Sequence, residues 1–158
     1  MKYVVTAACI LLFASLQAPV VMANNFQENQ LKADQHYQQG DFKKAHKAYL
    51  KLAKKGDHYS QDRVSQMYTR GEGKSANLTH AYAWSVLAAE SGDEHLLSNS
   101  DLLLQSTEDP AKAQSSAAKL KKKYGKQALE KKAAMMAARE KQRKSGSCTG
   151  THLACSRG

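Results

Sequence analysis

The residues with the clearest capacity for chemistry stand near the C-terminal end of the chain. Cys148, His152 and Cys155 are side chains of the kinds that ligate zinc, and the two cysteines can instead pair with each other. A structural zinc site usually takes four ligands, and no fourth candidate lies nearby in the sequence. We therefore expect a disulfide between Cys148 and Cys155. It closes a short loop and constrains the unfolded chain, which stabilises the fold by about 2 to 3 kcal/mol.

A serine and a lysine at S-x-x-K spacing could support acyl transfer. The tetrad is Ser116-Ala117-Ala118-Lys119, and Lys144-Ser145-Gly146 faintly resembles the K-T-G element that accompanies it in penicillin-recognising enzymes. The S-D-N element is missing, and a chain rich in Ser and Lys produces such a tetrad by chance. The histidines show neither ligand spacing nor a partner nucleophile; they are His36, His46, His58, His80, His95 and His152. We therefore expect no catalysis and no cofactor.

The first 23 residues have the composition of a secretory signal. Lys2 provides a positive start, the run from Val4 to Leu16 is apolar, and Val21-Met22-Ala23 has the small-residue pattern that signal peptidase cleaves. Gln17 and Pro19 interrupt the apolar run, which leaves it shorter than the ~20 residues that a spanning helix needs. We expect cleavage after Ala23 and export to the periplasm or the medium, where disulfides are permitted.

Two stretches of the mature chain align without a gap and indicate an internal repeat. The matched pairs are Ala45 with Ala81, Ala48 with Trp84, Tyr49 with Ser85, Leu52 with Ala88, Ala53 with Ala89 and Gly56 with Gly92. Steps of three or four place these small and aromatic residues on one helix face, and each stretch ends in a glycine that can adopt the left-handed cap conformation. Asp57 and Asp93 follow as expected N-caps.

A second helix precedes each of these stretches and ends in Tyr-x-x-Gly, at Tyr37 with Gly40 and at Tyr68 with Gly71. The predicted unit is thus helix, glycine turn, helix, glycine turn. We expect helices at about 26–39, 42–55, 58–70, 78–91 and 94–106, with neighbouring helices antiparallel. Asn77 is expected to cap the helix that Leu78 begins.

The second unit carries a more specific pattern of small residues, Met-Tyr, Gly-x-Gly and Ala-x-x-Trp. Its members are Ser60, Val64, Met67, Tyr68, Gly71, Gly73, Asn77, Ala81, Trp84, Ala88, Ala89 and Gly92. In these residues the unit resembles the Sel-one-like repeat, a branch of the tetratricopeptide-like helical repeats. Lys74 and Ser65 depart from the family pattern, and the first unit has a shortened turn at Gly40-Asp41. The resemblance implies an all-α chain built as an α/α hairpin solenoid, with an adaptor role in assembling envelope or signalling complexes.

The residues expected to pack within and between the hairpins are small, aromatic or turn-forming. They are Tyr37, Gly40, Ala45, Tyr49, Gly56, Met67, Tyr68, Gly71, Gly73, Ala81, Trp84, Ala88, Ala89 and Gly92. Antiparallel helices approach closely where Ala or Gly lines the contact. The first helix of each hairpin is expected to line a concave face. The packing pattern leaves four side chains free there as candidate partner contacts: Gln35, Arg63, Gln66 and Arg70.

Charge divides the chain in two. Residues 24–111 hold 10 Lys and Arg against 12 Asp and Glu, whereas residues 112–158 hold 13 against 2. Asp109-Pro110 predicts a helix start, because the aspartate caps the helix and the proline tolerates its first turn. The expected organisation is a signal peptide at 1–23, two hairpin repeats at 24–108 with the better match at 57–92, a basic helix at 109–144 that Gly125 could kink, and a tail with the Cys pair at 145–158.

These features predict a non-enzymatic interaction module of the bacterial cell envelope that binds a protein or peptide partner. An alternative is an electrostatic binder of anionic lipid or polysaccharide through the basic helix from Lys119 to Lys144. Nucleic acid is disfavoured, since aromatic residues for base stacking are nearly absent from that segment. A more distant alternative is a β-lactam-interacting enzyme acylated at Ser116, because some cysteine-rich relatives of the repeat family have been described as binding or hydrolysing β-lactams.

Overall fold

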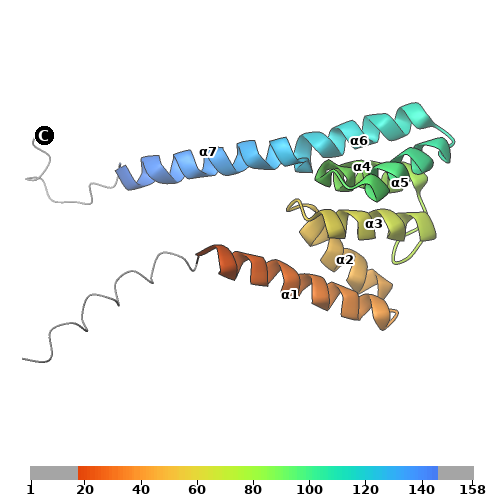
Figure 1. Ribbon diagram of the computed structural model, residues 1–158, viewed down its shortest axis with the longest axis horizontal. Coiled ribbons are helices and arrows are strands. Elements are labelled where there is room, and N and C mark those ends of the chain that lie inside the picture. Colours follow the sequence, from red (N-terminus) through yellow and green to blue (C-terminus); the bar gives the residue numbers. More distant parts are fainter. Residues whose placement is uncertain (1–17, 146–158) are drawn as a thin grey trace, which may run out of the picture.

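All regular secondary structure in the described part of the chain is helical. The computed structural model describes the backbone of residues 18–145 and the side chains of residues 26–144. Its elements are α1 (Ala18–Gln38), α2 (Phe42–Ala53), α3 (His58–Arg70), α4 (Leu78–Ala88), the short 3-10 helix η1 (Ala89–Ser91), α5 (Glu94–Gln105), α6 (Pro110–Tyr124) and α7 (Lys126–Ser145) (Figure 1). The predicted all-α class is confirmed for these residues. Cys148, His152 and Cys155, and with them the expected disulfide, lie outside the described residues.

Polar side chains fix four of the helix starts. The capping residues are Asp57, Asn77, Asp93 and Asp109, and each accepts a hydrogen bond from a backbone N–H in the first helical turn. Pro110 occupies the first turn of α6, where its missing N–H leaves no hydrogen bond unmade. The predicted starts of α3, α4, α5 and α6 are confirmed, and each cap stabilises its helix by about 1 kcal/mol.

The turn between α3 and α4 depends on two glycines. Gly71 has φ +74° and ends α3 in the left-handed conformation, and Gly73 has φ +73°. A Cβ placed on Gly73 would lie 2.3 Å from the carbonyl oxygen of Phe42. The Gly-x-Gly turn therefore packs directly against the backbone at the start of α2, which only a residue without a side chain permits.

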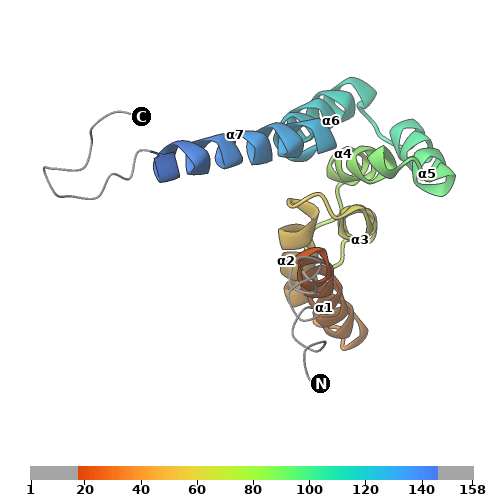
Figure 2. The same cartoon turned by 60° about the vertical axis from the view of Figure 1, so that its left-hand side comes forward.

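Successive helices pack side by side. Helix α1 lies on α2, α2 on α3 and α3 on α4, while both α5 and α6 pack against α4 (Figures 1 and 2). The short turns between α1 and α2 and between α3 and α4 make two hairpins. Helix α6 packs mainly on α4, so the first half of the expected basic helix belongs to the helical stack rather than to a separate segment.

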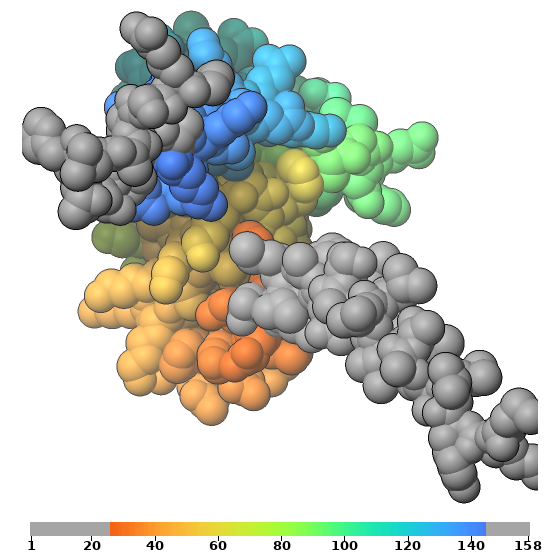
Figure 3. All heavy atoms as spheres, turned by 90° about the vertical axis from the view of Figure 1, so that its left-hand side faces the viewer, coloured from red at the N-terminus to blue at the C-terminus, as the bar shows by residue number. Residues whose placement is uncertain are grey.

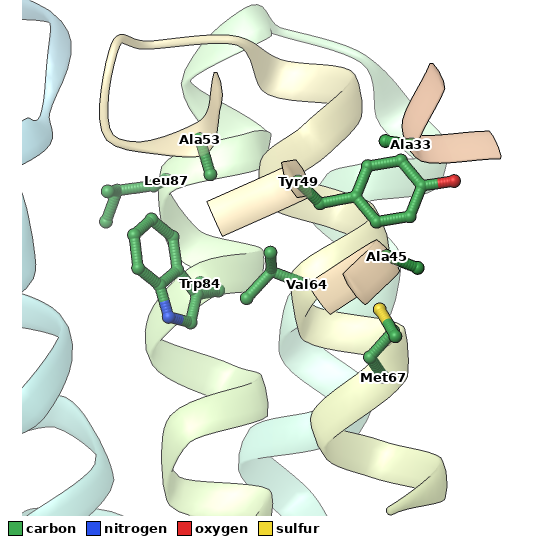
Figure 4. Packing of buried hydrophobic residues seen from close by; sticks show 8 residues of the cluster. All are labelled: Ala33, Ala45, Tyr49, Ala53, Val64, Met67, Trp84 and Leu87. Carbon is green, nitrogen blue, oxygen red and sulfur yellow. The ribbon is translucent and has the colours of Figure 1, made fainter. Parts of the chain in front are cut away.

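The buried cluster joins the two hairpins. Its members are Ala33, Ala45, Tyr49, Ala53, Val64, Met67, Trp84 and Leu87, drawn from α1 to α4 (Figure 4). Of the residues expected to pack, the buried ones are Ala45, Tyr49, Met67, Ala81, Trp84 and Ala88, whereas Tyr37, Tyr68 and Ala89 are partly exposed. The ring of Tyr124 in α6 stacks on Trp84, with centroids 6.0 Å apart and planes 18° apart, which ties α6 to the cluster.

Two expected boundaries were wrong. Helix α1 begins at Ala18 rather than near residue 26, and it continues through Ala23, the expected cleavage position. Pro19 lies in the first turn of α1, where proline is tolerated. The basic segment is two helices and not one, because Gly125 adopts an extended conformation with φ −68° and ψ 159° between α6 and α7. No helix in residues 18–145 is both long enough and apolar enough to cross a membrane.

Candidate partner-binding surface

Arg63 of α3 lies at the centre of a cluster that connects the first two hairpins. Its guanidinium carbon is 4.3 Å from the ring centroid of Tyr37 in α1 and 5.5 Å from that of Tyr49 in α2. Its Nη1 donates a hydrogen bond to Oε1 of Gln66 at 3.1 Å. The Nε is buried and has no hydrogen-bond partner within the described residues. Arg63 is thus half-buried against two aromatic rings, with part of its donor capacity unused.

Asp34 of α1 accepts hydrogen bonds from two tyrosine hydroxyls, one of which belongs to Tyr49, the residue that also lies against Arg63. Tyr49 and Tyr59 both donate to its Oδ1, and the distance from the Tyr59 hydroxyl is 2.8 Å. Burial, followed by the hydrogen bond to Asp34, raises the pKa of both tyrosines above the ordinary value. Both hydroxyls therefore stay protonated and act as donors.

A second set of hydrogen bonds runs along the C-terminal half of α3. The Tyr37 hydroxyl donates to Oε2 of Glu72 at 2.9 Å and accepts a hydrogen bond from Nη1 of Arg70 at 3.1 Å. Gln66 donates to Oδ2 of Asp62 at 2.7 Å, and burial raises the pKa of that carboxyl group. We call the whole set the tyrosine–arginine face, which consists of Asp34, Tyr37, Tyr49, Tyr59, Asp62, Arg63, Gln66, Arg70 and Glu72.

The four predicted partner contacts differ in their surroundings. Gln35 is exposed on α1, next to Asp34. Arg70 is exposed on α3, whereas Arg63 and Gln66 are half-buried there, and all three make the hydrogen bonds just described. Long polar side chains that lie partly between helices find partners within the chain. The structure nevertheless brings these three side chains together on one surface.

Sequence reasoning missed Asp34, Tyr59 and Glu72. They match no repeat position, and their role arises from contacts between residues 15 to 35 positions apart along the chain. The available signal was compositional, because tyrosine and arginine are the residues most enriched in protein interfaces. Tyr59 keeps 45% of its surface exposed, and Leu31, one turn before Asp34 on α1, keeps 61%.

An open hollow extends this surface toward α5. Its volume is ≈ 690 Å³, and it is lined by His58, Tyr59 and Asp62 of α3 together with Asp93, His95 and Leu96 at the start of α5. Asp93 uses its carboxylate to cap α5, and the His58 ring lies 3.2 Å from the carbonyl oxygen of Leu87. The hollow therefore has two acidic groups and an exposed aromatic ring at its edge.

The residues singled out for catalysis are not assembled into a site. Ser116 and Lys119 lie on α6, whereas Lys144 is at the far end of α7. Residues 126–144 between them form one helix, which spans roughly 28 Å at 1.5 Å per residue. Within residues 18–145, no group of three or more His, Cys, Asp or Glu side chains is arranged to hold a metal ion.

Comparisons of the chain with protein-family models, with curated proteins and with solved structures gave no match.

Proposed function

We propose that this protein is a non-enzymatic interaction module that binds a protein or peptide partner on its tyrosine–arginine face. The observation that carries the proposal is the position of Arg63, half-buried between the rings of Tyr37 and Tyr49 with its Nε unpaired. Arginine and tyrosine held in a partly dry, well-packed setting are the typical anchors of protein interfaces.

The rigidity of the tyrosine–arginine face also supports a role in binding a partner. Tyr37, Tyr49 and Tyr59 each have their hydroxyl held by a carboxylate, so these large side chains are fixed before any partner arrives. A surface that is already ordered loses less conformational entropy on binding, and this raises affinity without further contacts. We infer that the contact region runs from Gln35 and Tyr59 into the hollow at Asp93.

The finer architecture is part of the proposal. We infer an α/α hairpin solenoid of the Sel-one-like type, in which α1, α3 and α5 form the row that binds and α2, α4 and α6 form the supporting row. The packing of α6 on α4, within the supporting row, supports this arrangement. Export, expected from residues 1–23, makes the cell envelope the place where the partner is met.

Site-specific photo-crosslinking tests the proposal. A photoreactive benzoylphenylalanine replaces Gln35, which is exposed on α1 next to Asp34, and in a matched control it replaces Lys47, which is exposed on α2. We expect a discrete protein or peptide adduct at position 35 only, lost when Arg63→Met is added. Equal adducts at both positions, or an adduct at position 35 that Arg63→Met leaves unchanged, would show that this face is not the binding surface.

A further inference from the structure

Helix α7 leaves the helical stack after its first turns. In Figures 1 and 2 it continues the direction of α6 past the end of the body, and Figure 3 faces this end of the molecule, with α7 in blue. Every side chain from 130 to 139 is exposed, including Met135 at 57% and Met136 at 58%. The 20 residues of α7 carry seven Lys and Arg against two Glu, so the projecting helix is strongly positive.

The structure brings the end of α2, which carries Lys54 and Lys55, beside the start of this helix. Lys54 places its Nζ 6.0 Å from the ring centroid of Tyr124, and a Cβ on Gly56 would lie 2.8 Å from Cδ1 of Leu129. The end of α2 therefore lies against the first turns of α7. The residue after Lys54, Lys55, extends toward α1, where its Nζ lies 5.8 Å from the ring centroid of Phe26. We define the cationic surface as Lys54, Lys55, Lys126, Lys131, Lys132, Arg139, Lys141, Arg143 and Lys144, all of which are exposed.

Few of these charges are neutralised within the described chain. Glu140 pairs with Arg143 at 3.0 Å and with Lys144 at 3.5 Å. In the part of the chain that the structure describes, Lys126, Lys131, Lys132, Arg139 and Lys141 have no carboxylate within 4 Å. Cations crowded in this way repel one another, and a bound polyanion relieves that repulsion and releases counterions.

The positions of the cations around α7 indicate which class of polyanion the helix can bind. Successive residues turn by about 100°, so Lys131, Lys132 and Lys141 point to three different sides of the helix. A helix that lies in a membrane surface needs an apolar face opposite its cations. Helix α7 has none, because Lys132, Arg139 and Arg143 lie between Met135 and Met136 around the helix. Phe, Tyr and Trp are absent from α7, so no ring is available to stack on nucleic-acid bases.

We infer that the cationic surface binds an acidic polysaccharide. A flexible chain of carboxylate-bearing sugars can wind along α7 and continue onto Lys54 and Lys55, and so reach cations on every side of the helix. This binding site is separate from the tyrosine–arginine face and does not depend on the partner proposed there. It anchors the module to a polymer while the other face remains available.

Binding of the mature chain to fluorescently labelled alginate oligosaccharides tests the inference. Three variants carry the same change in charge: Lys131→Glu with Lys132→Glu on α7, Lys54→Glu with Lys55→Glu on α2, and the control Lys43→Glu with Lys47→Glu on the other half of α2. We expect the first two pairs to weaken binding by about ten-fold or more and the control by no more than about two-fold, with affinity falling as salt is raised.

Weaker binding of the Lys54 and Lys55 variant is the result that depends on the fold. If α7 bound the polysaccharide by itself, substitutions on α2 would leave the affinity unchanged. Equal weakening by all three pairs would mean that net charge alone is sensed and would overturn the inference. Tighter binding to phosphatidylglycerol vesicles or to duplex DNA, at the same concentration of anionic groups, would overturn the choice of polymer. Circular dichroism verifies that each variant is folded, and Lys→Gln pairs replace any Lys→Glu pair that unfolds the chain.

Discussion

Glu90 caps the start of α7 through its contact with Lys126. Its Oε2 accepts a hydrogen bond from the backbone N–H of Lys126 at 2.7 Å, while its Oε1 lies 3.1 Å from Nζ of Lys121 in α6. The first N–H groups of a helix have no partner within the helix, and an anionic acceptor there is favoured by the helix dipole. A single carboxylate from η1, with 15% of its side chain exposed, thus holds the two sides of the break at Gly125.

Replacing Glu90 is expected to destabilise the chain and to loosen α7. Glu90→Ala removes the cap and the ion pair and should lower the free energy of unfolding by about 1 to 2 kcal/mol, whereas Glu90→Gln keeps an acceptor and should lose about half as much. Urea denaturation followed by circular dichroism measures both values. Glu108→Ala, which removes an exposed acidic residue from the loop before α6, is the control and should change stability by less than about 0.5 kcal/mol.

Gly73 and Gly40 form a matched pair for testing the turn that packs on α2. Both have positive φ, +73° and +77°, so alanine at either position adopts an unfavourable backbone conformation that costs about 1 kcal/mol. A Cβ at Gly40 meets nothing within 4 Å, whereas one at Gly73 would lie 2.3 Å from the Phe42 carbonyl oxygen. We expect Gly73→Ala to lower the free energy of unfolding by roughly 2 kcal/mol more than Gly40→Ala, because the backbone of α2 must move.

Chemical denaturation of the two alanine variants gives this difference directly. If Gly73→Ala and Gly40→Ala lower the free energy of unfolding by similar amounts, the turn accommodates the added Cβ without further destabilisation. The contact with Phe42 would then not be what holds the second hairpin against the first.

Short-range signals in the sequence predicted most of the helix boundaries correctly. Asp57, Asn77 and Asp93 cap the helices that follow them because a cap acts within three residues, so its partner is already visible in the sequence. The start of α1 differs for another reason. Residues 1–23 are expected to be a signal peptide, so the first helix is expected only after them, whereas α1 begins at Ala18 with Pro19 in its first turn.

Contacts between distant residues account for what the sequence did not reveal. Glu90 lies 36 residues before Lys126, so the break at Gly125 could be anticipated as a kink but not as a capped junction. Arg63 was identified as a surface residue on α3, but nothing in its neighbours along the chain indicated that Tyr37 and Tyr49 would enclose it. Side-chain clusters of this kind depend on how whole helices pack, which a repeat pattern specifies only at its small and aromatic positions.

Replacing Arg63 with lysine is expected to destabilise the fold although the positive charge is kept. The planar guanidinium stacks on the Tyr37 ring and donates to Gln66, whereas an ammonium group is more strongly hydrated and cannot stack in this way. We expect Arg63→Lys to lower the free energy of unfolding by about 1 kcal/mol, and Arg63→Met to lower it by a similar amount. Thermal melts of both variants give the comparison. Full wild-type stability for Arg63→Lys would show that charge alone suffices at this position.

His46 makes the stability of the fold depend on pH. The ring is 2% exposed and packs edge-on against Tyr68, with centroids 5.2 Å apart, and its Nε2 has no hydrogen-bond partner within the described residues. Burial, with smaller contributions from the positive charges of Lys74 and Lys54, lowers the pKa of His46 below the ordinary value of 6.5. The folded chain therefore takes up a proton at His46 less readily than the unfolded chain does.

The sign of the effect follows from this difference. Well above pH 6.5 both states hold a neutral His46 and the stability is complete. As the pH falls through about 6.5 the unfolded chain binds a proton that the folded chain does not, and the unfolded chain is thereby stabilised relative to the folded chain. Urea midpoints for wild type should decrease between about pH 7.5 and pH 5.5, and the decrease should be smaller in His46→Phe, which cannot be protonated. His95→Gln, at an exposed histidine, should keep the wild-type dependence. An unchanged pH dependence in His46→Phe would mean that other groups control the acid sensitivity and that the buried ring of His46 does not contribute to it.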